Sequence, residues 1–153
     1  MSRWTATVHA SATPCQVLEV LTHPEKIRTW SPVEFDLDEL DGRRLAAGTR
    51  GRVTGRLAGV NVGFDLEVHA ADSSGLQLSA DGPVGLDVHY ELTVIEDLGA
   101  QVNATVSVRK SGGLTGRLVA NAAAAMLSAG ALEDAAGRIA RAAESRPPLA
   151  AAA

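Results

Sequence analysis

The sequence lacks the features that mark several common protein classes. It has no uninterrupted apolar run long enough to cross a bilayer, so it predicts no transmembrane helix. Its net charge is −4, and this acidic balance disfavours a general nucleic-acid binder. A single cysteine, Cys15, excludes an intramolecular disulfide. Residues 1–12 show no secretory signal, so we expect a cytoplasmic protein.

Aromatic side chains are also scarce, at 3% of 153 residues, whereas hydrophobic residues reach 46%. That hydrophobic content excludes a disordered chain. A core built mainly from alanine, valine and leucine has few large side chains, so internal space is harder to fill. The length predicts one domain, which we place at residues 1–144, followed by a flexible tail at 145–153.

The amino-terminal part predicts one strand and two short helices. Apolar and polar residues alternate over residues 4–10, as in a half-buried strand. Thr13 and Gln16 have the spacing of a capping box, which predicts that a helix begins at Pro14. Pro24 interrupts that helix and begins a second one, which Pro32 ends after Trp30.

The middle of the chain predicts six further strands joined by short turns. Apolar residues alternate with polar ones over residues 33–38, 50–57, 60–68, 76–80, 86–94 and 102–108. Consecutive strands with short connections predict an antiparallel meander. Arg50, Arg52 and Arg56 share one face, and we expect them to form ion pairs with the acidic strand before them. The functional alternative is an anion-binding arginine patch.

Residues 114–143 are rich in alanine and contain no proline, so they predict one long helix. Gly130 and Gly137 weaken it locally. Its predicted apolar face consists of Leu118, Ala122, Ala125, Ala129, Leu132, Ala136 and Ile139. The whole order of elements predicts an α+β fold, in which a curved seven-stranded antiparallel sheet wraps around this carboxy-terminal helix.

The segment HASATPCQVLEVLTHPEKIRTWSP resembles the opening of the START-like (SRPBCC) superfamily, in its polyketide cyclase/dehydrase and lipid-transport branch. Pro14, His23-Pro24-Glu25 and Trp30-Ser31-Pro32 occupy the places of the proline-started helix, the break and the tryptophan segment. The stretches LAAGTRGR and VGLDVHYELTV and the last helix also fit, so the resemblance extends from Arg3 to about Ala143. It departs at Leu18, where members often carry tryptophan. The resemblance implies a helix-grip fold with a cavity between sheet and helix.

We expect a ligand in that cavity to contact residues on the inward strand faces, the second helix and the last helix. These are Trp30, Phe35, Phe64, Leu66, Leu78, Tyr90, Leu118, Ala122 and Met126. Tyr90 has the one strongly polar tip on a predicted inward face, and it is our candidate for a catalytic proton donor. It either orients a ligand or donates to a backbone carbonyl.

Other chemistry is poorly supported. His9, His69 and His89 point away from the predicted core, and no residue spacing resembles a metal site. We expect no cofactor, because no phosphate loop, dinucleotide fingerprint or Gly-x-Ser-x-Gly elbow occurs.

Three functions follow from these observations. The first is binding of a small hydrophobic ligand, such as a lipid, an isoprenoid or a polyketide-like molecule, without catalysis. The alternative is a polyketide cyclase or dehydratase that uses the same cavity. A protein-interaction module without a ligand is the third, and a homodimer is compatible with each of them.

Overall fold

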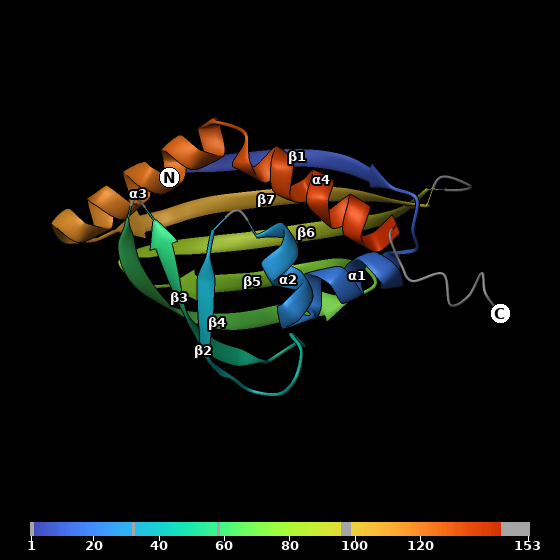
Figure 1. Ribbon diagram of the computed structural model, residues 1–153, viewed down its shortest axis with the longest axis horizontal. Coiled ribbons are helices and arrows are strands. Elements are labelled where there is room, and N and C mark those ends of the chain that lie inside the picture. The colour runs from blue at the N-terminus through green and yellow to red at the C-terminus, as the bar shows by residue number, and fades with distance from the viewer. Residues whose placement is uncertain (1, 32, 58, 96–98, 145–153) are drawn as a thin grey trace.

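The chain forms one antiparallel sheet with helices packed against it (Figure 1). The computed structural model describes residues 2–31, 33–57, 59–95 and 99–144, and these form seven strands and four helices. The elements are β1 (Ser2–Ala10), α1 (Pro14–Thr22), α2 (Pro24–Trp30), β2 (Phe35–Leu40), β3 (Arg50–Leu57), β4 (Val60–Asp72), β5 (Gly75–Asp81), β6 (Val84–Ile95), β7 (Gly99–Ser111), α3 (Gly113–Ser128) and α4 (Ala131–Glu144). The predicted α+β class is confirmed. The tail predicted at 145–153 lies outside the described residues.

The strand order is β1-β7-β6-β5-β4-β3-β2. From β2 to β7 each strand pairs with the next one in the sequence, which confirms the predicted meander. β1 pairs with β7, so Trp4 lies opposite Val106. β1 and β2 therefore form opposite edges, and the chain between them has to cross the sheet. This crossing places α1 and α2 over the sheet.

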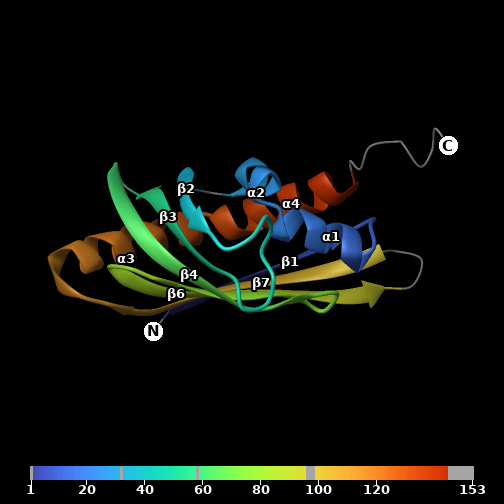
Figure 2. The same ribbon diagram turned by 90° about the horizontal axis from the view of Figure 1, so that it is seen from below.

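The helices α1, α2 and α4 lie on the same side of the sheet (Figure 2). Burial along the strands follows from this arrangement. In β4, Val62, Phe64 and Val68 are buried, whereas Asp65 and Glu67 are exposed. The alternating apolar and polar residues of the sequence therefore lie on the helix-covered face and the open face of the sheet, respectively.

The first helix begins as its sequence predicts. The Thr13 side chain accepts a hydrogen bond from the Gln16 backbone N–H at 3.2 Å, and the Thr13 N–H donates to Gln16 Oε1 at 2.8 Å. Pro14 occupies the first turn, where no N–H donor is required. The predicted capping box is confirmed, and it sets the point at which the chain leaves β1 to cover the sheet.

Removing this cap should lower stability measurably. Thr13→Ala deletes the oxygen that accepts from Gln16, so we expect the free energy of unfolding to fall by about 1 kcal/mol. Thr13→Ser keeps a hydroxyl at the same place and should cost less than half as much. Urea unfolding of both variants measures the difference. Equal losses for serine and alanine would contradict a role for the hydroxyl.

The arginines of β3 form ion pairs on the open face, partly with other partners than expected. Arg56 lies 3.4 Å from Glu34, on the β2 side, as predicted. Arg52, however, lies 3.0 Å from Asp65 of β4, its partner in the antiparallel register. The prediction considered only the preceding strand, although β3 has a neighbour on each side. These carboxylates leave little free charge for an anion-binding patch.

The predicted carboxy-terminal helix is divided in two. α3 ends at Ser128 and α4 begins at Ala131, and between them Gly130 adopts a φ of 101°, which glycine tolerates well. The break changes which side of the helix faces the sheet. No described helix has the length and apolarity that a membrane span requires.

Candidate functional site

An apolar cavity of about 290 Å³ lies between the sheet and the helices. Every described element except β1 contributes lining residues. Among them is no charged side chain, and the polar ones are Ser31, Trp30 and Tyr90. Its volume is near the lower end of the range for small-molecule sites, and its apolar lining is typical of them.

Seven of the nine residues expected to contact a ligand line this apolar cavity. They are Trp30, Phe35, Phe64, Leu66, Leu78, Tyr90 and Met126. Four come from inward positions of β4, β5 and β6, which alternation identifies, and Phe35 comes from the edge strand β2. The strands contribute as the sequence predicts because the pleat leaves each side chain only two directions.

The other two expected residues, Leu118 and Ala122, do not line the apolar cavity. Leu118 is 53% exposed, and Ala122 packs beside a separate group of buried side chains. The helix residues that do line it are Ala123, Met126 and Leu127 of α3 and Leu132 and Ala135 of α4. The prediction assumed one continuous helix, so it extended the correct face of α4 back through Gly130 onto the wrong side of α3.

Small helix residues help to leave this space open. Ala123 and Ala135 line the apolar cavity, and neither carries more than a methyl group. A larger side chain at either place would occupy part of it. The sequence contained a second possible helix face, with the spacing of the residues that are buried in α3: Gly116, Val119, Ala123 and Leu127. Reading α3 separately from α4 would have identified it.

Leu45 is a lining residue that sequence reasoning missed. It lies in the connection between β2 and β3, where alternation offers no guide. Its backbone N–H donates to the Thr22 carbonyl oxygen at 2.9 Å, which ties this connection to the end of α1. In the sequence, the one indication that Leu45 is buried was its place as a single leucine between polar and small residues. In the fold its side chain is 7% exposed.

Trp30 and Tyr90, which both line the apolar cavity, contact each other. Their ring centroids are 5.7 Å apart at an interplanar angle of 77°, an edge-to-face contact. The Trp30 indole N–H donates to the Val20 carbonyl oxygen at 3.0 Å. The polar end of Trp30 is therefore already engaged, and its ring fixes the position of Tyr90.

The Tyr90 hydroxyl makes no hydrogen bond to any described residue. The space that Tyr90 lines is the apolar cavity. Among the described residues no backbone carbonyl accepts from Tyr90, and a role in orienting a ligand stays a prediction. Burial raises the pKa of the Tyr90 phenol well above its usual value, so it remains a protonated donor at neutral pH.

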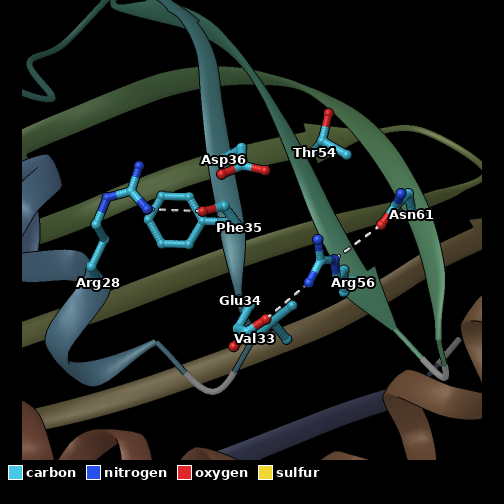
Figure 3. Close-up of a pocket in the computed structure, with 8 residues that line it drawn as sticks. All are labelled: Arg28, Val33, Glu34, Phe35, Asp36, Thr54, Arg56 and Asn61. Carbon is cyan, nitrogen blue, oxygen red and sulfur yellow. Dashed lines mark hydrogen bonds and ion pairs between the residues drawn. The ribbon is translucent and has the colours of Figure 1, made fainter.

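A second, polar pocket of about 310 Å³ adjoins the apolar cavity at β2 (Figure 3). Val33 and Phe35 line both spaces. Arg28 donates to the Phe35 carbonyl oxygen at 3.1 Å, and its guanidinium lies 5.0 Å from the centre of the Phe35 ring. Arg56 is held by Glu34 and Asn61. Strand β2 therefore separates an apolar space from a charged one.

The open face of the sheet has a polar group that resembles a hydrolase triad only in composition. Ser79 donates to Asp87 Oδ1 at 2.9 Å, and His69 Nε2 lies 2.7 Å from the Ser79 oxygen. Because the serine proton is directed to Asp87, His69 acts as the donor in this contact. A catalytic histidine must instead accept the serine proton. No cluster of three potential metal-ligating side chains occurs within the described residues.

Solved structures share this fold at low sequence identity. A Thermus thermophilus protein, TTHA0849, matches with a TM-score of 0.68 and 18% identity over 99% of this chain and 100% of its own. The Mesorhizobium loti protein MLL2253 matches with a TM-score of 0.63 and 16% identity over 95% and 98%. DynU16, a protein of the dynemicin biosynthetic locus, has a TM-score of 0.58 and 21% identity over 95% of this chain and 48% of its own.

Sequence comparison identifies the family. No curated protein has a significantly matching sequence. The family model described as polyketide cyclase / dehydrase and lipid transport matches residues 1–144, which is nearly all of the chain. This match agrees with the fold, and it confirms the resemblance that the amino-terminal motifs indicated. The chain belongs to the polyketide cyclase/dehydrase and lipid transport family.

Proposed function

We propose that this protein binds a small hydrophobic ligand in the apolar cavity. The observation that carries the proposal is the lining, whose described residues include no charged side chain. Burial of apolar ligand surface contributes about 25 cal/mol per Å², so such a lining supplies affinity without specific polar contacts. The family description, which includes lipid transport, is consistent with a ligand of this kind.

A polyketide cyclase or dehydratase is the second candidate, and Tyr90 is the observation that favours it. Its hydroxyl is an uncommitted proton donor in the apolar cavity, whose shape would fold a flexible substrate. The described lining residues include no second titratable group that could act as a base. We therefore place binding first. Loss of turnover in Tyr90→Phe, with binding retained, would reverse this order.

A matched pair of alanine substitutions tests whether the ligand occupies the apolar cavity. Ala123 lines it and is 4% exposed, whereas Ala125 is exposed on the same helix. Ala123→Trp should fill part of the space and weaken ligand binding by at least about tenfold, which is about 1.4 kcal/mol. Ala125→Trp should leave the affinity unchanged. Binding is measured with the hydrophobic molecule recovered by organic extraction, or with a fluorescent apolar probe.

Native mass spectrometry of the freshly purified protein gives the first readout. We expect a hydrophobic adduct that is present in the wild type and in Ala125→Trp and is depleted in Ala123→Trp. Ala123→Leu serves as a milder variant if the tryptophan variant does not fold. Equal binding by all of these variants would contradict the proposed site. A protein-interaction role would then gain support, and the exposed Leu114 and Leu118 of α3 are candidate contact residues for it.

The remaining proposals concern location and partners. We propose a cytoplasmic location. We also propose that the protein has no nucleic-acid partner, since its net charge of −4 would repel a phosphate backbone. A homodimer is a further proposal, which light scattering coupled to size-exclusion chromatography tests directly.

A further inference from the structure

The polar side chains that line the apolar cavity differ in whether they form hydrogen bonds within the protein. Trp30 donates to the Val20 carbonyl oxygen, and the Ser31 hydroxyl donates to the Val33 carbonyl oxygen at 2.8 Å. Tyr90 alone among these described lining residues has a hydroxyl without a protein partner. Because a buried donor without an acceptor costs free energy, a ligand that supplies the acceptor is favoured over one that does not.

From this arrangement we propose that the ligand is an uncharged molecule, apolar over most of its surface, with one carbonyl or ether oxygen that accepts a hydrogen bond from Tyr90. This inference rests on the proposed function, since it requires a ligand in the apolar cavity. It adds a chemical class: neutral ketones, quinones, esters or ethers, and not ionised acids.

The exclusion of ionised acids follows from the charges around the apolar cavity. No cation lines it. Two arginines line the adjoining polar pocket beyond β2, where Arg28 donates to the Phe35 carbonyl oxygen and Arg56 donates to Glu34. A carboxylate inside the apolar cavity would lose its hydration without gaining an opposite charge.

A carbonyl or ether oxygen also fits better than a hydroxyl. Tyr90 and a ligand hydroxyl form one hydrogen bond between them, and one of the two O–H donors is then left without an acceptor. A carbonyl or ether brings no donor of its own, so the single bond from Tyr90 satisfies every donor present. The unused lone pair of the acceptor costs less than an unused donor.

Three naphthalene probes of matched shape test this inference on the wild-type protein. They are 2-acetylnaphthalene, the hydrocarbon 2-isopropenylnaphthalene and ionised 2-naphthoate. Their dissociation constants are measured by calorimetry at neutral pH. We expect the ketone to bind about fivefold more tightly than the hydrocarbon, as one added hydrogen bond would give. The carboxylate should bind at least about a hundredfold more weakly than the ketone.

Tyr90→Phe is the matched variant. It should reduce the affinity for the ketone to that for the hydrocarbon, and leave the hydrocarbon affinity within about twofold. The hydrocarbon therefore reports any general damage to the apolar cavity, and the comparison on the wild type needs no variant to fold.

Each outcome bears on a different claim. Equal binding of ketone and hydrocarbon, or an equal loss of both in Tyr90→Phe, overturns the inference and leaves the apolar cavity as a hydrophobic site. Binding of 2-naphthoate as tight as that of the ketone overturns it as well. If no probe binds and Ala123→Trp loses no adduct, the proposed function itself fails, and the inference falls with it.

Discussion

Ile139→Ala should lower the free energy of unfolding by about 2–5 kcal/mol. Ile139 is fully buried on α4, the helix that packs against β1, α1 and α2. Removing three carbon atoms there loses their transfer free energy and leaves a void that the surrounding elements cannot close, because α4 is held on several sides. Urea unfolding followed by circular dichroism measures the change.

The control for this prediction is Leu118→Ala on α3. Leu118 is 53% exposed, so its truncation should change stability by less than about 1 kcal/mol. Both residues belong to the apolar face that a single long helix would have, yet only Ile139 is buried. A cost for Leu118→Ala as large as that for Ile139→Ala would mean that α3 faces the sheet as the single helix predicted.

Gly75→Ala should be the most damaging of the conservative glycine substitutions in the sheet. Gly75 begins β5 with a φ of 141°, a conformation that residues with a Cβ atom avoid. An added Cβ would also overlap the backbone carbonyl oxygen of Tyr90. We expect a loss of about 2–4 kcal/mol in unfolding free energy, because the backbone of β5 or β6 has to shift.

Gly63→Ala is the matched control, since Gly63 lies in β4 with open space where the Cβ would be placed. It should change stability by less than about 1 kcal/mol, and a small gain is compatible with the reduced freedom of the unfolded chain. Thermal unfolding compares the two variants. A loss in Gly75→Ala no larger than that in Gly63→Ala would contradict the close approach of Gly75 to Tyr90.

The inward strand positions of the candidate site were predictable from local pattern. In a strand each side chain points to one of two faces, so alternation alone placed Phe64, Leu66 and Tyr90 on the same side as the helices. The start of α1 was predictable for a similar reason, because the hydrogen bonds between Thr13 and Gln16 are local.

The helical side of the site was not predictable in the same way. An apolar face on a helix is defined only as far as the helix continues without a break, and Gly130 ends that continuity. The alanine-rich sequence of α3 offers two weakly different faces, of which packing against the sheet selects the one with Val119 and Leu127. Helix propensity describes whether a segment is helical and not which of its faces is buried, so it does not predict this choice.

The order of residues was sufficient for the α+β class, the seven strands and the inward position of Tyr90, because each depends on hydrogen bonds or alternation between near neighbours. Three features depended on the assembled molecule: the ion pair of Arg52 with Asp65, the face of α3 that is buried, and the lack of a hydrogen-bond partner for the Tyr90 hydroxyl among the described residues. These features arise between segments that are distant along the chain, where several pairings are chemically acceptable. Only the simultaneous packing of sheet and helices chooses among them.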